Sequence, residues 1–263
     1  MWGADLQPKL FGWFHILGMV LAVGFGYGGV LLGRKFKETS DKGKAILILS
    51  VAEAALVLLE VIKQIFYTLE SGSYRWDMFP MQICSVIIFV LPVAIIAKRG
   101  VVKNSALGFV GFCSLAGAIF YFFNPSAAFN TPYVLMSIHS FLWHWIMIAT
   151  GTFVIVSFDL LKKGTVGMLV GSYAVWFVFA VVAAVSNNVA NFYAPELNVD
   201  YYHIGYVKVI YPLLNLVFKR PEPYVPFFLC FLVYYALGTV AIYFAAKGVT
   251  KFNNKLFPKP TEN

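Results

Sequence analysis

Repeated apolar runs constrain the fold of this chain more than any other feature of its sequence. An α-helix rises 1.5 Å per residue, so about 20 apolar residues cross a hydrocarbon core of about 30 Å. Hydrophobic residues make up 60% of the chain and charged residues only 12%, whereas about a quarter of the residues in soluble domains are charged. The sequence therefore predicts an integral membrane protein.

The apolar runs predict an all-α, polytopic bundle of seven transmembrane helices in a single domain, 1–263. They cover residues 13–32, 45–68, 80–97, 105–123, 133–161, 166–186 and 223–246. The polar outer loop 187–222 is too long for a simple connection, and we expect a lid or an interfacial helix there. We expect the basic cytoplasmic tail 247–263 to end in disorder and to contact anionic lipid.

The basic residues predict the orientation of the bundle. Most of the 20 Lys and Arg residues fall in the segments 34–44, 98–103, 162–163 and 247–259, which alternate helices would place on one side. Because basic loops stay in the cytoplasm, we expect the N-terminus outside and the C-terminus inside. The net charge of +8 is scattered over short loops, so we expect membrane lipids as partners and no nucleic acid. A multi-pass protein of a plasma membrane fits this pattern.

Ionisable residues in the second run need a reason, because a charge in a membrane helix costs about 2.5–3.5 kcal/mol. Glu53, Glu60, Lys63, Gln64 and Tyr67 follow one stripe of the expected helix, which must face the bundle interior or a water-filled cavity. Two interpretations remain open. Glu60 and Lys63 form a pair that only neutralises itself, or the stripe belongs to a binding site.

The third run begins with a polar group at Gln82, Cys84 and Ser85. Cys84 can act as a nucleophile if a base lies nearby, and otherwise it is a small buried side chain. Cys113 and Cys230 stand in apolar stretches and are interpreted as core residues. Three cysteines without a CxxC pattern support neither a disulfide framework nor a thiolate metal site.

The fifth run carries His139, Ser140 and His144. Ser140 and His144 share a helix face, whereas His139 and His144 lie about 140° apart. Each histidine is either an interhelical hydrogen-bond partner or part of a site. The spacing does not suit metal ligands on one helix, and no nucleotide, haem or flavin motif is present. We therefore expect no metal and no cofactor.

Asn187 and Asn191 follow the sixth run and are interpreted either as helix caps or as amide donors to a substrate. Counting 1.5 Å per residue from the outer boundary places most of the costly polar groups in the outer half of the membrane. The sequence therefore predicts an outward-facing polar cavity. Such a cavity could accept an amphiphile or form the vestibule of a transporter.

Four segments of the chain together resemble the YwaF-like integral membrane family of bacterial seven-helix proteins, which is similar to the eukaryotic TMEM-type acyltransferase of ether phospholipids and implies a bacterial cell membrane. They are residues 80–85, residues 140–144, the Asn187 to Tyr193 segment and residues 221–224. The resemblance covers most of the chain and implies a phospholipid acyltransferase with Cys84 as nucleophile and His144, rather than His139, as base. The family commonly has a histidine where this chain has Gln82, which cannot accept a proton.

The residues leave two other hypotheses beside an acyltransferase. The chain could be a non-enzymatic transporter or binder of a small amphiphile or ion, with Glu60, Lys63 and His144 as its site. It could also be a structural scaffold, although burying so many polar groups in one half of a membrane argues against that.

Overall fold

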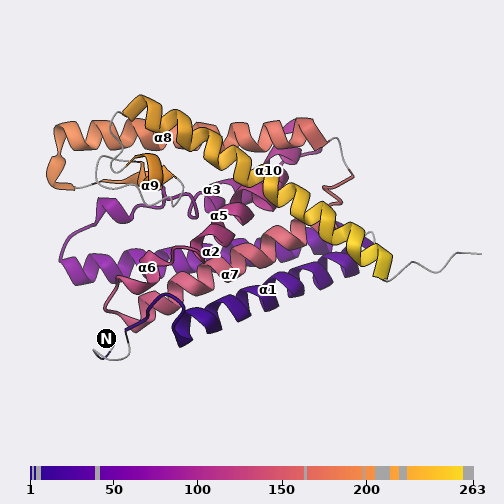
Figure 1. The fold of residues 1–263 in the computed structure, drawn as a ribbon, viewed down its shortest axis with the longest axis horizontal. Coiled ribbons are helices and arrows are strands. Elements are labelled where there is room, and N and C mark those ends of the chain that lie inside the picture. The colour runs from indigo at the N-terminus through magenta and orange to yellow at the C-terminus, as the bar shows by residue number, and fades with distance from the viewer. Residues whose placement is uncertain are drawn as a thin grey trace, which may run out of the picture.

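The computed structural model describes residues 1, 3, 7–38, 42–162, 165–197, 199–204, 214–218 and 224–256. These residues form an all-α bundle (Figure 1), as the apolar runs predict. The long helices are α1 (Trp13–Glu38), α2 (Lys42–Ser71), α7 (Val134–Ser157), α8 (Thr165–Tyr193) and α10 (Tyr224–Leu256). A further rod consists of α4 (Val101–Gly108), the π-helix η3 (Phe109–Ser114) and α5 (Leu115–Tyr121).

Six helices within the described residues are long and apolar enough to cross a membrane, one fewer than the sequence predicts. The third expected span, 80–97, contains only the ten-residue helix α3 (Ile87–Ile96), which covers about half of a hydrocarbon core. Residues 79–86 instead form turns, with Ser85 and Val86 both donating their backbone N–H to the Gln82 carbonyl. Irregular backbone at membrane depth persists only where protein covers it or where it lines a cavity.

Two helices extend beyond their expected ends. Helix α8 continues to Tyr193, so Asn187 and Asn191 lie on its last turns instead of in a loop. Helix α10 continues to Leu256, so the first part of the expected tail is helical. Both ends carry polar residues that continue a helix outside an apolar core, and hydropathy windows do not detect such extensions. The remainder of the tail, 257–263, lies outside the described residues.

The outer segment contains three short helical turns: η4 (Pro195–Leu197), η5 (Tyr201–His203) and α9 (Leu214–Val217). Two others, η2 (Trp76–Met78) and α6 (Ser126–Phe129), lie at the same end of the bundle. Much of the expected loop 187–222, including 205–213 and 219–222, lies outside the described residues, so the expected lid remains a prediction.

Glycines bring α1 and α7 close together along most of their length. An added Cβ at Gly29 would clash with the Ala149 carbonyl oxygen, and the hydroxyl of Thr152 donates a 3.0 Å hydrogen bond to the Gly26 carbonyl. Small residues of this kind allow the close helix contacts that stabilise membrane bundles.

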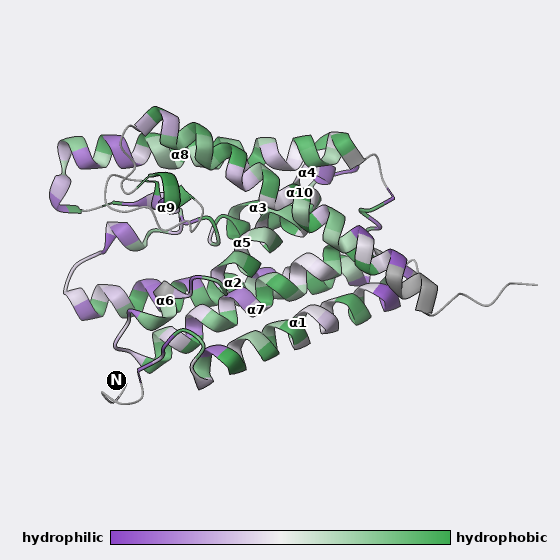
Figure 2. Ribbon diagram, in the orientation of Figure 1, coloured by the Kyte–Doolittle hydropathy of each residue, from purple (hydrophilic) through white to green (hydrophobic). Residues whose placement is uncertain are grey.

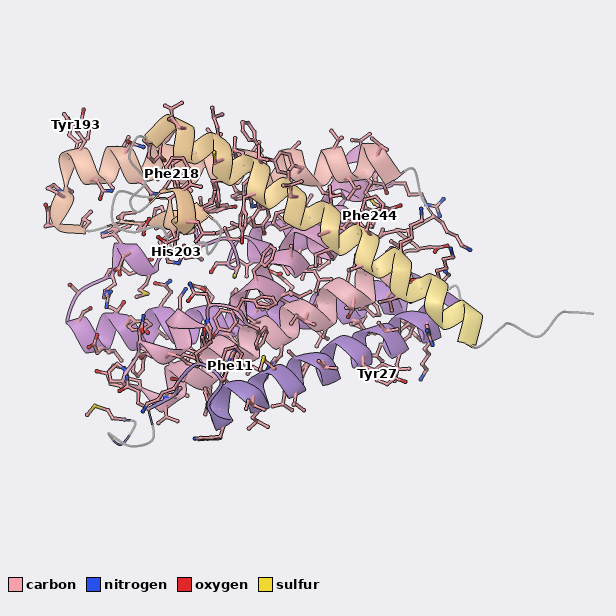
Figure 3. The ribbon with its side chains drawn as sticks, viewed as in Figure 1. Phe11, Tyr27, Tyr193, His203, Phe218 and Phe244 are labelled. Carbon is pink, nitrogen blue, oxygen red and sulfur yellow. The ribbon has the colours of Figure 1, made fainter. Side chains whose placement is uncertain are left out.

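The lateral surface of the bundle is apolar (Figure 2), and aromatic side chains such as Tyr27 on α1 and Phe244 on α10 project from it (Figure 3). Successive long helices alternate in direction (Figure 1), so one end carries the segments 34–38, 97–103 and the end of α10. A 2.9 Å ion pair from Lys37 to Asp159 joins the last turn of α1 to the turn that follows α7 at this basic end. The segments 72–86 and 194–204 lie at the opposite end.

Candidate functional site

A cavity of about 970 Å³ opens at the end of the bundle that lies opposite the basic loops. Its walls come from α2, the turns before α3, α5, α7, the η5 region and α10. Five of the predicted polar site residues line it together with Cys84 and His144: Glu60, Lys63, Gln82, His139 and Ser140. Residues as far apart in sequence as Glu60 and Tyr235 therefore meet around one space.

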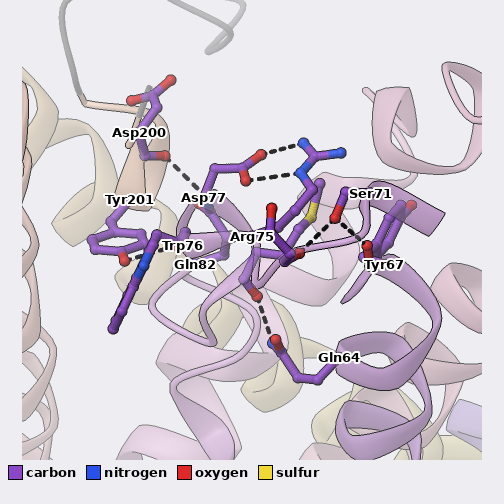
Figure 4. A network of polar contacts seen from close by, with 11 residues as sticks. Gln64, Tyr67, Ser71, Arg75, Trp76, Asp77, Gln82, Asp200 and Tyr201 are labelled. Carbon is purple, nitrogen blue, oxygen red and sulfur yellow. Dashed lines mark hydrogen bonds and ion pairs between the residues drawn. The ribbon is translucent and has the colours of Figure 1, made fainter. Parts of the chain in front are cut away.

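On the α2 side, the cavity is lined by the carboxylate of Glu60, which has one oxygen without a hydrogen-bond partner among the described residues. Glu60 is 7% exposed, and its Oε1 accepts a 2.9 Å ion pair from Lys63 and a 2.6 Å hydrogen bond from Gln64. Its Oε2 is buried and has no hydrogen-bond partner among the described residues. Gln64 also donates to the Met78 carbonyl at 2.7 Å (Figure 4), which ties α2 to η2. Gln64 itself is not among the residues that line the cavity.

Cys84 lies in the turns that replace the first half of the third expected span. Trp143 on α7 donates its indole N–H to the Cys84 carbonyl at 3.2 Å, which ties this segment to the helix that carries His144. Gln82 donates its amide to the Asp200 carbonyl at 3.0 Å (Figure 4), and its Oε1 is buried without a partner among the described residues. The turns thus place Cys84 on the cavity wall. Hydrogen bonds to Trp143 on α7 and to the Asp200 carbonyl hold this segment in place.

The two histidines of α7 take different roles. His139 Nε2 lies 2.8 Å from the Leu59 carbonyl oxygen, so this ring donates a hydrogen bond across to α2. His144 is 6% exposed, and its Nδ1 lies 2.6 Å from the carbonyl oxygen of Ser140. Because a carbonyl only accepts, Nδ1 carries the proton and Nε2 keeps a lone pair. His144 Nε2 has no partner among the described residues.

The side chains of Asn187 and Asn191 hold backbone and do not line the cavity. Asn187 is fully buried; it donates to the Tyr201 carbonyl at 2.9 Å and accepts the Tyr201 N–H at 2.8 Å. Asn191 donates to the Val199 carbonyl at 3.2 Å. Residues 199–204 are therefore strapped to the end of α8, and we call this segment the strap.

The strap also connects to the loop that follows α2. Tyr201 donates its hydroxyl to the Trp76 carbonyl at 2.8 Å (Figure 4), and burial raises the pKa of Tyr201 to about 12, so the hydroxyl keeps its proton near neutral pH. Beside it, Arg75 pairs with Asp77, and this hydrogen bond raises the pKa of the Arg75 guanidinium. Arg75 and Asp77 both line the cavity, so its mouth carries charges of both signs.

Sequence reasoning missed Tyr121, which ends α5 and lines the cavity. Its ring stacks on the ring of His144, with 3.5 Å between the centroids and 7° between the planes. The two residues are 23 positions apart and lie on different helices, so no periodicity in the sequence indicates the contact. No group of three or more His, Cys, Asp or Glu side chains within the described residues could hold a metal ion.

Comparison with known proteins gives one family. Neither a curated protein nor a solved structure matches the chain. The TMEM164 family matches residues 10–250, a stretch that includes every helix from α1 to most of α10 and every residue of the cavity wall. The chain therefore belongs to the TMEM164 family of multi-pass membrane proteins.

Proposed function

We propose that this protein is a membrane acyltransferase that carries an acyl group on Cys84 and uses His144 as its base. One observation supports the proposal above the others. A single cavity is lined by a free cysteine and by a buried histidine whose Nε2 has no partner among the described residues. A cysteine becomes a strong nucleophile only when a base can take its proton, and His144 is in the tautomer that can do so.

The reaction divides into two acyl transfers. The Cys84 thiol gives its proton to His144 Nε2, and the sulfur attacks the ester carbonyl of a phospholipid. The tetrahedral intermediate collapses by breaking the ester C–O bond, and the departing oxygen takes the proton from the imidazolium. The hydroxyl of a second lipid then gives its proton to His144 while its oxygen attacks the thioester. The C–S bond breaks, and the thiolate recovers the proton.

Backbone carbonyls fix the orientation of this pair. In hydrolases with a catalytic triad, a carboxylate holds the tautomer of the base. Here the Ser140 carbonyl takes that place, because it accepts the Nδ1 proton of His144 at 2.6 Å. Gln82 supplies no second base, and its amide instead anchors the strap through Asp200. The chemistry we propose therefore needs one acid–base group.

The cavity suits a lipid that enters from the outer leaflet. The basic end of the bundle would stay in the cytoplasm, so the cavity would open on the outer side of a plasma membrane. Charged residues such as Arg75 and Asp77 line it, as do aromatic residues such as Phe120 and Tyr234. A phospholipid presents the same combination, with a charged head and an apolar chain.

A second function is favoured by the unpartnered Oε2 of Glu60. A buried carboxylate oxygen without a partner in a membrane protein suits a binding site for a cation or a hydrogen-bond donor. In this alternative, the protein binds or transports a small amphiphile or ion, and Cys84 is a packing residue.

Acyl transfer between a labelled phospholipid and a second lipid in liposomes tests the proposal. We expect Cys84→Ala to abolish transfer while the protein keeps its melting temperature. Cys230→Ala should keep wild-type transfer, because Cys230 is exposed on α10 and does not line the cavity. Wild-type turnover by Cys84→Ala would contradict the acyltransferase. A loss of ligand binding in Glu60→Gln, with no effect of Cys84→Ala, would support the alternative.

A further inference from the structure

The ring of Tyr121 covers one face of His144 at van der Waals distance. The centroids are 3.5 Å apart and the planes differ by 7°, so the two rings lie almost parallel and directly over one another. Tyr121 is 9% exposed and His144 is 6% exposed, so water does not compete for this contact. The stack is therefore a fixed part of the cavity wall.

Such a stack suits one protonation state of the histidine better than the other. Two neutral aromatic rings prefer an offset or an edge-to-face arrangement over a direct sandwich. A cation placed over the face of a tyrosine is attracted by the negative charge density of that face, and more strongly when both groups are desolvated. The stack therefore interacts more favourably with an imidazolium formed at His144 than with the neutral imidazole of the resting site.

A second contact links Tyr121 to the group that holds the tautomer. The hydroxyl oxygens of Tyr121 and Ser140 are 2.8 Å apart and hydrogen bonded. The carbonyl of the same Ser140 accepts the proton on His144 Nδ1. Tyr121 thus contacts His144 through its ring. Through its hydroxyl, Tyr121 contacts Ser140, the residue whose carbonyl orients His144.

We infer that Tyr121 is a positioning residue for His144, which holds the imidazole ring in place and stabilises the imidazolium formed when the Cys84 thiol gives up its proton. This inference rests on the proposed function. It adds an electrostatic role for a tyrosine, since the imidazolium exists only after the proton transfer. The stabilisation therefore acts on the chemical step and not on the binding of the lipid.

Two substitutions distinguish the contribution of the Tyr121 ring from that of its hydroxyl. Tyr121→Phe keeps the aromatic face and loses the bond to Ser140, so we expect kcat within about threefold of wild type. Tyr121→Leu loses both, and we expect kcat to fall by about tenfold or more with KM unchanged. Phe122→Leu is the matched control, because Phe122 is the next residue, is also buried and packs on Phe141 without a ring contact to His144.

Equal kcat values in Tyr121→Leu and wild type would overturn the inference, as would a loss in Phe122→Leu as large as in Tyr121→Leu. A loss confined to KM would also overturn it, since that would indicate a binding role.

A spectroscopic readout keeps the inference separate from the proposed function. The chain has 4 histidines, so ¹⁵N-histidine labelling gives few signals, and His144→Ala identifies those of His144. We expect a single Nδ1–H tautomer in wild type and in Tyr121→Phe, and a mixture of tautomers in Tyr121→Leu. An unchanged single tautomer in Tyr121→Leu would contradict the positioning role even if the wild type transferred no acyl group. A wild type without acyl transfer, but with the expected tautomer shift, would refute the proposed function alone.

Discussion

Asn187→Ala should release the strap from the end of α8. The amide of Asn187 donates to the Tyr201 carbonyl at 2.9 Å and accepts the Tyr201 N–H at 2.8 Å, and no part of Asn187 is exposed. Alanine removes both bonds at once, and the Tyr201 carbonyl keeps only a longer contact of 3.4 Å from the Ile204 N–H. The N–H of Tyr201 is then left without a partner among the described residues, in a buried position.

The loss of folding free energy follows from leaving a buried backbone group without a hydrogen-bond partner. A buried donor left without a partner costs about 1–3 kcal/mol, and the lost hydrogen bond to the Tyr201 carbonyl adds about 0.5–1.5 kcal/mol. We expect a loss near 3 kcal/mol, because the strap can open locally and let water replace part of the bonding. Asn191→Ala removes one longer bond, of 3.2 Å, from a half-buried residue, and about 1 kcal/mol is expected there.

Hydrogen exchange measured by mass spectrometry reports this opening directly. Peptides that contain the Tyr201 amide should exchange about 100-fold faster in Asn187→Ala, since about 1.4 kcal/mol corresponds to a factor of ten. Peptides from α1 and α7 should exchange at wild-type rates, because neither helix contacts Asn187 through a hydrogen bond. Unchanged exchange at Tyr201, or equal acceleration across the whole chain, would refute the reasoning.

Three other predictions concern the base, the helix packing and the free carboxylate. His144→Ala should lower the rate of Cys84 acylation by about 100-fold or more, measured in single turnover, while a rate within threefold of wild type would exclude it as the base. Gly29→Ala should destabilise the protein by about 1–3 kcal/mol in a denaturant titration, because its Cβ meets α7 backbone. Gly28→Ala has open space and should be neutral or stabilising, so equal losses would contradict this packing. Glu60→Gln should leave acylation within about threefold of wild type, since Glu60 does not act on the thiol; a complete loss would move it into the chemistry.

The sequence predicted the long helices because a membrane helix satisfies its backbone hydrogen bonds within its own segment. Its presence therefore follows from the length of an apolar run alone. It failed at residues 80–97, which are apolar enough for a span but contain only α3. Hydropathy reports how much a segment prefers an apolar environment, and both lipid and the protein interior satisfy that preference. Whether residues 79–86 form helix or turns depends on contacts such as those of Gln82 and Cys84 with distant segments.

The candidate site was predictable in its residue types and less so in their roles. The cost of burying charge identified Glu60 and Lys63, and helix periodicity placed Ser140 and His144 on one face, as the structure shows. The Asn187 amide could equally be a cap, a ligand donor or a tie to the strap, because only the fold decides which partner it meets. Contacts between helices, such as Tyr121 on His144, carry no periodic signal in one sequence.

The proposed function depends most on acyl transfer through Cys84, and intact-protein mass spectrometry measures this transfer directly. Purified wild type and Cys84→Ser would be incubated with a phospholipid that carries a labelled acyl chain, and then treated with hydroxylamine, which cleaves thioesters. We predict an acyl adduct on the wild type that hydroxylamine removes, and none on Cys84→Ser. Equal labelling of the two proteins, or no adduct on either across several lipid classes, would contradict the proposed function.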